Sequence, residues 1–354
     1  MAVLLPSTSS LFILLAILAL WRLVVCRYLR YRRSQLIARL DPVKDCHAIN
    51  SYTLFVEFPF LYRLGTQLEM FRNVGIPVIA RLLKKGGFMT GNLSKRFDDA
   101  DILIREMLLH HVDSPRGSLA IRRLNLLHSY YRIDNDEYLY LLSLRVLGVI
   151  ELSARYGYRE WTEREKCSHY TVWHDIAVRM GIRNIPASLA ELARFRDEYE
   201  AQHMVYHPDN QVMADSGMQL LLDQIPFKLV SPLVIKIALS LIDNRALTAV
   251  GYPIQPKYLV FLCQSILKLH GAVVRWMPPR PLLWTQTRIP LSCPYSDLHR
   301  ALPLSYHCFR PYTYKQGYKI AEIGGIKHGK LGNLCEGDIL CPLQDDNPHA
   351  RAAS

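Results

Sequence analysis

The stretch Arg122–Tyr131, RRLNLLHSYY, is the part of the sequence that decides the fold class. Apolar residues recur at helical spacing from Ile121 to Tyr131, and His128 falls inside this apolar stripe. A histidine on a buried helix face is usually a core residue that hydrogen-bonds a neighbour. A neutral imidazole on the wall of a helix bundle can also bind haem iron, with the porphyrin between the helices. Periodicity alone leaves both interpretations open.

The segments around this stretch predict further helices with clear start and stop signals. We expect one helix to start at Asp98 or Asp99 and the next to follow a break at 115–117. The later helices begin with Asp, Thr or Ser followed three residues on by Glu, which is the spacing of a capping box. Strand-like alternation is scarce, so the predicted fold class is all-α. The expected helices are 98–112, 117–131, 134–157, 162–181 and 188–204, and the capping pairs are Asp134/Glu137, Thr162/Glu165 and Ser188/Glu191.

Composition divides the chain into three parts. Residues 1–35 hold an apolar run and a basic flank, and residues 36–285 hold a helical domain that follows a linker reaching about residue 50. Residues 286–354 are rich in Pro, Gly, Cys and Tyr and are predicted to be an irregular C-terminal extension. Half of the 354 residues are apolar, which is ample material for a core.

The apolar segment from Val3 to Cys26 is predicted to be an uncleaved transmembrane anchor. As a helix it extends about 36 Å, enough to cross a bilayer. The basic cluster RYLRYRR follows at 27–33, so the positive-inside rule places the bulk of the protein in the cytosol as a single-pass protein. A cleaved signal peptide is the alternative, but its basic residues would precede the apolar run.

Two later stretches, 229–242 and 257–274, are also strongly apolar. Each falls short of a clean 18-residue span and contains an internal Lys, so we expect buried or interfacial helices there.

The formal net charge of +12 is not a nucleic-acid signal, because five arginines lie within the first 35 residues, which contain no acid. We therefore predict no nucleic-acid partner. The eight cysteines are scattered without a C-x-x-C pair, which fits a reducing compartment. The sequon Asn92-Leu93-Ser94 is then expected to stay unglycosylated, which makes it a test of topology.

Several catalytic patterns are absent from the sequence, including C-x-x-C-H, G-x-S-x-G, H-E-x-x-H and the P-loop. His111 and Asp113 match the H-x-D half of a facial triad for non-haem iron, but a solvated pair at a helix end is the expected arrangement. His203 and His207 are four apart and could face one metal ion. Because Pro208 ends that helix, a surface turn is expected there instead.

A series of segments in order along the chain resembles the fungal mpaB-type oxygenases, which share a superfamily with the bacterial latex-clearing rubber oxygenases. The resemblance covers roughly residues 54 to 330, and no single motif within it is diagnostic. The segments are EFPFLYRLGTQLEMFRNVGIP, KRFDDADILI, RRLNLLHSYY, DEYLYLLSLRVL, YREWTEREKCSHYTVWHDIAVRMGI, IPASLAEL, EYEAQHM, PPRP and GYKIAEIGG.

The resemblance implies an all-helical, globin-like bundle that binds haem b and uses dioxygen as co-substrate to cleave a carbon–carbon double bond in an isoprenoid. In this family the histidine at the position of His128 is the proximal iron ligand. The mpaB branch is anchored to the endoplasmic reticulum and trims a farnesyl chain on an aromatic polyketide. The implied partners are a lipophilic prenylated substrate, the membrane and other enzymes of the pathway.

In the rubber-oxygenase branch an Arg, followed three and four residues on by Lys and Thr, contributes to the distal pocket. Arg96 matches that Arg, Asp99 stands where Lys is found, and Ala100 replaces the usual Thr. Arg96 and Asp99 are therefore the candidate catalytic residues. The missing hydroxyl at Ala100 puts in doubt any role of this position in steering oxygen. For Arg96 the alternative is a salt bridge with Asp98 or Asp99 at the start of the helix.

For the cofactor, the candidate residues are His128 as the iron ligand and Arg123, which with Arg122 could pair with haem propionates or phospholipid. His169 and His174 lie on predicted helices near the core, and either is a candidate sixth ligand.

The leading hypothesis is a membrane-anchored, haem-dependent oxygenase that cleaves an olefin in a prenylated natural-product intermediate. The alternative, suggested by Ala100, is a non-catalytic haem- or lipid-binding membrane protein of the same fold.

Overall fold

The structure is a computed structural model that describes residues 8–86, 93–223, 231–280, 318 and 320–324. Predictions that concern Asn92 or most of the stretch 286–354 lie outside the described residues. Within them the chain is helical and contains no β-strand, which confirms the all-α prediction. The globin-like arrangement of the helices stays a prediction.

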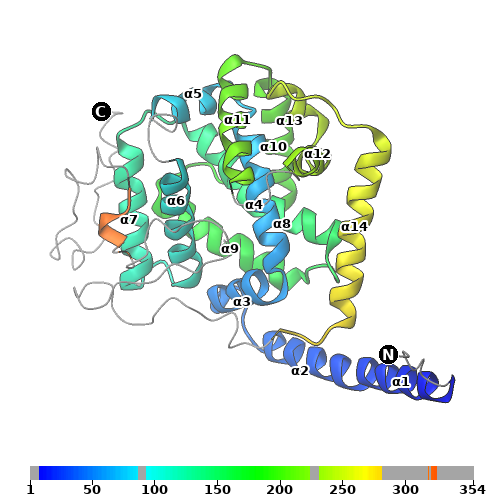
Figure 1. Ribbon diagram of the computed structural model, residues 1–354. Helices are drawn as coiled ribbons and strands as arrows, with labels where there is room; N and C mark the ends of the chain where they lie inside the picture. Colours follow the sequence, from blue (N-terminus) through cyan, green and yellow to red (C-terminus); the bar gives the residue numbers. More distant parts are fainter. Residues whose placement is uncertain (1–7, 87–92, 224–230, 281–317, 319, 325–354) are drawn as a thin grey trace.

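The N-terminal part is one continuous rod that projects from the body of the molecule (Figure 1). It consists of α1 (Thr8–Leu20), a π-helical turn η1 (Trp21–Cys26) and α2 (Arg27–Ala38). The expected linker to about residue 50 was wrong, because α2 continues the helix. Residues 27–40 contain no Pro or Gly and consist mostly of good helix formers, so nothing stops the helix before Asp41-Pro42.

The centre of the body is built from α3 (Cys46–Tyr52), a π-helical turn η2 (Thr53–Glu57), α4 (Pro59–Val74), α8 (Asn135–Tyr156) and α9 (Glu163–Arg179). The long helix α8 packs against both α4 and α9, and α3 also packs against α9. The core-facing residues of α8 and of the helices packed against it contribute to the larger of two apolar clusters. Burial of this continuous apolar surface is what holds these helices together.

The start signals of the later helices are largely confirmed. Both halves of the capping box are present at Asp134/Glu137 and at Thr162/Glu165. At the start of α10 (Leu189–His203), Ser188 accepts the backbone N–H of Glu191 at 3.2 Å. The Glu191 carboxylate accepts from the backbone of Ala187 at 3.1 Å instead of closing the box.

Helices α6 (Leu93–Leu109) and α7 (Pro115–Ser129) pack against each other, and both begin earlier than predicted. The supposed break at 115–117 is the first turn of α7, since Pro at the first helical position needs no N–H partner and Ser114 caps the helix. Gly117 is needed there because a Cβ would lie 2.2 Å from the carbonyl oxygen of His111.

A short C-terminal segment, Tyr318 and 320–324 with the 3-10 turn η5 (Ile320–Glu322), packs onto α6 and α7. Tyr318 and Ile323 are buried in the larger apolar cluster, so these residues of the predicted irregular extension belong to the core. The hydroxyl of Tyr318 donates to Glu106 at 2.5 Å, and Nε of Arg123 donates to the carbonyl of Ile323 at 2.6 Å. The segment thus ties the two helices together.

The upper part of the body in Figure 1 surrounds a second apolar cluster. His203 ends α10 and His207 caps the next helix, so the predicted turn separates them. The elements that join α4, α8 and α10 around this cluster are α5 (Pro77–Lys85), α11 (Pro208–Leu222), α12 (Ser231–Leu241) and α13 (Asn244–Ala249).

Helix α14 (Lys257–Trp276) lies along the outer edge of the body. One face, with Cys263, Leu267 and Gly271, is buried. Gly271 permits close packing, because a Cβ there would lie 2.5 Å from the carbonyl oxygen of Tyr156 on α8. In the described part of the chain, two helical segments are long and apolar enough to cross a membrane, namely Phe12–Ala38 and Lys257–Trp276.

Candidate functional site

A cavity of about 280 Å³ lies between α4, α6, α7, α8 and α11. Its size is near the lower end of small-molecule sites, and its surface is mostly apolar with a few polar groups, which is the usual character of such sites. The lining residues are Tyr62, Thr66, Glu69, Met70, Asn73, Val74, Leu83, Phe97, Ala100, Asp101, Ile104, His128, Leu141, Leu144, Arg145, Met213, Ser216, Gly217 and Leu220.

His128 is the histidine among these lining residues. It lies in the last turn of α7 and is half-buried, with its ring centre 5.7 Å from that of Tyr138 on α8. The apolar stripe that contains it in the sequence therefore faces partly into a hollow and not only into packed core. An imidazole at the wall of such a cavity faces any ligand that fills it.

An ion pair between two helices forms one charged part of the wall, and Asp101 on α6 is another charged lining residue. Nη1 of Arg145 on α8 lies 3.1 Å from Oε2 of Glu69 on α4. Burial raises the pKa of Glu69, although the neighbouring guanidinium of Arg145 opposes this. A carboxyl group whose pKa is raised is protonated more readily than an exposed one. The sequence analysis missed both residues.

A signal for Glu69 was present in the sequence. Leu61, Gly65 and Glu69 are spaced four apart and form a buried face of α4. A carboxylate within an otherwise apolar stripe is a candidate for a cavity wall, because an ionised group is not fully buried without a partner. Arg145 supplies that partner from α8.

Arg96, Asp99 and Ala100, the α6 residues singled out in the sequence, lie at different places relative to the cavity. Ala100 lines the cavity, whereas Asp99 is buried beside it and accepts from Nζ of Lys95 at 2.9 and 3.0 Å. The same ammonium group donates to the carbonyl of Gly324 at 3.0 Å. Arg96 is half-buried, and neither Arg96 nor Asp99 is among the lining residues.

Arg123 is fully buried and faces the C-terminal segment, where it donates to Ile323. It is not among the lining residues of the cavity, and neither is the half-buried Arg122. Of the described residues that line the cavity, Arg145 provides the cation.

The other candidate histidines lie away from the cavity. His169 is fully buried, with Nδ1 2.7 Å from Oδ1 of Asn50 and Nε2 3.3 Å from the carbonyl of Arg145, and burial lowers its pKa to about 4. His174 is 40% exposed and is not a lining residue. Neither is placed to reach the same ligand as His128.

The two non-haem iron candidates are surface groups. The His111 and Asp113 side chains are each more than half exposed, and Asp113 accepts from Arg179 at 2.5 and 3.0 Å. Within the described residues there is no group of three or more His, Cys, Asp or Glu side chains that could hold a metal ion. The arrangement therefore matches the expected solvated pair.

The residues at the cavity suit haem by their chemistry. One imidazole on an apolar wall can act as an axial ligand, and a guanidinium at the rim can pair with a propionate. The fit to haem rests on these two side chains and not on the cavity volume. A volume of about 280 Å³ is small for a macrocycle together with a second ligand.

Comparison with known proteins identifies the class. Residues 110–276, which include His128 and Arg145, match the family model described as "ER-bound oxygenase mpaB/B'/Rubber oxygenase, catalytic domain". Over these residues the chain is similar to this family, which confirms the resemblance drawn from its sequence segments.

Three relatives are fungal proteins. The chain is 29% identical over 245 residues to "ER-bound oxygenase mpaB'" of Penicillium brevicompactum, covering 64% of this chain and 58% of the relative. It is 29% identical over 253 residues to "ER-bound oxygenase mpaB" of Penicillium roqueforti (strain FM164), covering 63% and 85%. The mpaB protein of Penicillium brevicompactum is 30% identical over 185 residues, 47% of each chain.

Proposed function

We propose that this protein is a membrane-anchored, haem-dependent oxygenase that cleaves a carbon–carbon double bond in the isoprenoid chain of a prenylated secondary metabolite. The observation that carries the proposal is the position of His128 on the wall of a mostly apolar cavity. The oxygenase names of the relatives support the reaction class.

His128 is the residue that would hold haem b, through its imidazole, and Arg145 would pair with a propionate. When bound, the cofactor supplies dioxygen binding and the electron transfer that opens an alkene. The reaction balances without another reductant: one dioxygen and one trisubstituted alkene give one ketone and one aldehyde.

The chain's own contribution is to bind the prenyl chain and to exclude water. Side chains such as Ile104, Leu141 and Met213 supply apolar contact along the cavity. Glu69, whose pKa burial raises, is the group that could hold a proton next to the reacting atoms. For Arg96, Asp99 and Arg123 the roles expected from the sequence remain proposals. We propose that Asp99, through its contact with Lys95, and Arg123 are positioning residues that hold α6, α7 and the C-terminal segment in register.

The test is a visible spectrum of the purified full chain. We expect a Soret band that His128→Ala abolishes and that the matched control His174→Ala retains. Added imidazole should restore the band in His128→Gly, because the ligand then enters the space the side chain has left. A full chain that stays colourless after haem-supplemented expression would exclude the proposal.

Activity is tested on a farnesylated phenol, with dioxygen consumption and product mass as the readouts. The expected products are two carbonyl fragments. A second candidate function, a non-catalytic haem- or lipid-binding protein, is favoured by Ala100, whose methyl group brings no hydroxyl to the cavity wall. Bound haem without dioxygen consumption on this substrate would support that second function.

For location, we propose the endoplasmic reticulum membrane, with a single N-terminal span and a cytosolic catalytic domain. The "ER-bound" names of the relatives and the apolar helix within Phe12–Ala38 support membrane association. In microsomes, Asn92 should stay unglycosylated, whereas a sequon introduced at the extreme N-terminus should be modified. Glycosylation at Asn92 would place the catalytic domain in the lumen.

A further inference from the structure

Helix α14 has two different faces. Cys263, Leu267 and Gly271 pack on the body, as described above. The opposite face presents large apolar side chains to the outside, with Tyr258 74% exposed and Phe261 72% exposed. The other exposed members of this stripe are Leu262, Ile266, Leu269, Val273 and Trp276, and we call the set the α14 apolar face.

Such a stripe is unusual on a protein surface in water, where large contiguous apolar patches mark an interaction site. The neighbouring helix α12 extends it with the exposed residues Leu233 and Ile237. Neither helix contains an Asp or Glu. Their basic residues, Lys236, Lys257, Lys268 and Arg275, are all exposed. An apolar stripe with basic and no acidic residues is typical of a helix that lies in the surface of an anionic bilayer.

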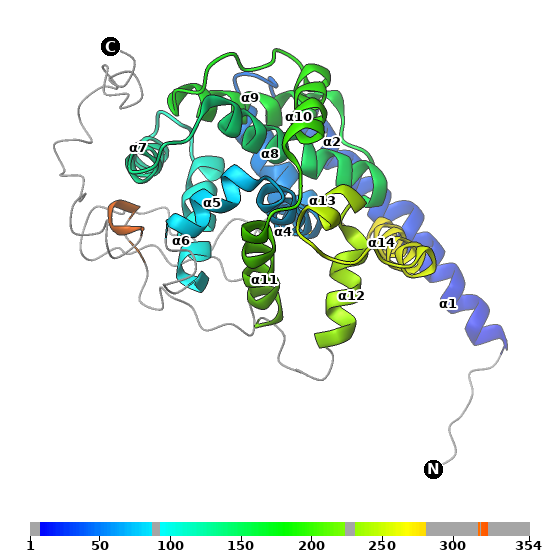
Figure 2. The same cartoon turned by 90° about the horizontal axis from the view of Figure 1, so that it is seen from above.

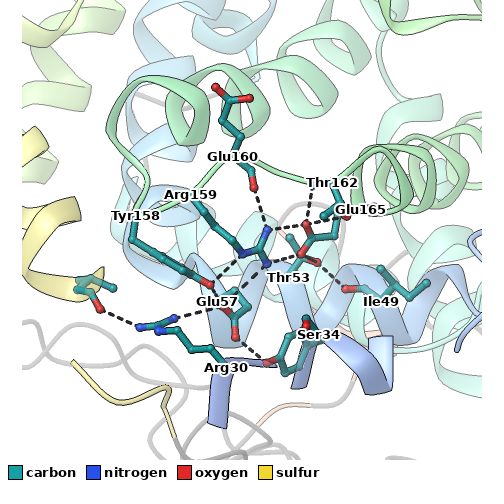
Figure 3. Close-up of polar contacts among 12 residues, drawn as sticks. Arg30, Ser34, Ile49, Thr53, Glu57, Tyr158, Arg159, Glu160, Thr162 and Glu165 are labelled. Carbon is teal, nitrogen blue, oxygen red and sulfur yellow. Dashed lines mark hydrogen bonds and ion pairs between the residues drawn. The ribbon is translucent and has the colours of Figure 1, made fainter. Parts of the chain in front are cut away.

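The C-terminal end of α14 is fastened to the membrane anchor. Nη2 of Arg30, on α2, donates to the carbonyl oxygens of Val274 at 2.8 Å and Met277 at 3.1 Å. Figure 3 shows this guanidinium between the end of α14, Glu57 and Tyr158. Arg30 lies 4.3 Å from the Tyr158 ring centre and 3.8 Å from the Glu57 carboxylate.

Two further contacts lie one and two turns back along the rod. The guanidinium of Arg22 lies 5.1 Å from the centre of the Trp276 ring, and Sγ of Cys26 contacts the carbonyl of Trp276 at 3.6 Å. Trp and Arg are the side chains that favour the boundary between lipid and water. The Arg22–Trp276 pair therefore marks the depth at which the anchor would leave the bilayer.

The direction in which α14 runs is consistent with a membrane boundary at the Arg22–Trp276 pair. In Figure 1 α14 runs across the line of α1 and α2, on the side of the body toward which α1 projects. Figure 2 shows α1 continuing beyond α14 on that same side. A membrane crossed by α1 would therefore lie along the length of α14, with the α14 apolar face against it.

We infer that α14 is a second membrane-contact element, which lies in the cytosolic interface of the bilayer without crossing it and docks the catalytic body onto the lipid. This inference rests on the proposed membrane anchor. Crossing would require α14 to leave its contact with α8 at Gly271, and it would take Lys268 into the hydrocarbon.

The experiment is photocrosslinking of the full chain in vesicles of phosphatidylcholine with about one fifth phosphatidylserine. Four single variants carry p-benzoylphenylalanine: Phe261 and Leu269 on the α14 apolar face, Leu18 in the anchor and Val178 on α9. All four positions are at least half exposed, so the new side chain replaces little packing, and equal melting temperatures verify the fold. Val178 is the matched control, because it is an exposed apolar residue outside α12, α14 and the anchor.

Lipid adducts at 261 and 269 are expected within about threefold of those at 18 and at least about tenfold above those at 178. Adducts at 18 with none at 261 or 269 would overturn the inference and leave the anchor intact. Crosslinks at 261 to a second copy of the chain would show that the face is a dimer contact instead. An absence of lipid adducts at 18 as well would refute the membrane anchor, and this inference with it.

Discussion

His128 on α7 and His169 on α9 look alike in the sequence, but their surroundings in the structure differ. Both lie within an apolar stripe of a helix. His169 is enclosed on all sides, with a partner at each ring nitrogen and the Trp161 ring edge-on to it at 5.2 Å. His128 lines a cavity. His169 is thus part of the packed core, whereas His128 forms part of a cavity wall.

The sharpest test of this comparison is to replace each histidine by alanine in turn. His128→Ala should lower the rate of alkene cleavage by at least about 100-fold, or about 2.7 kcal/mol, and leave the melting temperature of the haem-free protein within a few degrees of the wild type. Cleavage rate and haem content are measured together. A variant that keeps its haem and its rate would remove His128 from the site.

The opposite result is expected at the core position. His169→Ala should reduce the free energy of unfolding by about 2–4 kcal/mol, because it leaves a cavity and strands the partner amide of Asn50. Haem content per folded molecule should be unchanged. Loss of the Soret band in a protein that is still folded would identify His169 as an iron ligand and contradict its assignment to the core.

The two histidines should also differ in their response to pH. The pKa of His169 is lowered to about 4 by burial, so the unfolded state binds the proton more readily below its ordinary value of 6.5. Stability should therefore fall as the pH drops from about 6.5 toward 4, by about 2 kcal/mol at pH 5 for this group. His169→Phe should make the free energy of unfolding depend less on pH over this range. Burial also lowers the pKa of His47 to about 4, so some of the slope should remain.

A smaller effect is expected from the charged pair on the cavity wall. Glu69→Gln removes the proton-holding group but keeps its shape, and should lower the cleavage rate about tenfold without loss of haem. The pH profile of the rate is the deciding measurement, because a purely structural carboxylate would not shift it. Glu151→Gln is the control, since Glu151 pairs with Arg196 away from the cavity.

The smallest effect should come from Ala100. Ala100→Thr places a hydroxyl on the cavity wall and should change the cleavage rate by about two- to fivefold without altering the spectrum of the haem. An inactive parent that becomes active in this variant would favour the second candidate function for the natural chain.

Much of the fold followed from local chemistry. Capping pairs such as Thr162/Glu165 form within four residues, so the sequence contains all that is needed to predict them. The start of α7 was misplaced because Pro115 and Gly117 suit either a turn or a helix start. The close contact of Gly117 with His111, which decides between them, depends on how the two helices pack.

The candidate site was predicted only in part, for the same reason. His128 could be selected from the sequence, because its apolar stripe lies within one helix and the family resemblance assigns a role to its position. Glu69 and Arg145 become a pair only when α4 packs against α8. The direction taken by Arg123 is set by a segment two hundred residues further on, and no local pattern contains that information.

This long separation along the sequence affects how the protein folds during synthesis. The contact between Arg123 and Ile323 spans 200 positions, and Tyr318 completes the packing of α6 and α7. On a ribosome, α7 emerges about two hundred residues before this closing segment. The helices that surround the cavity therefore cannot complete their packing until residues 318–324 have been translated.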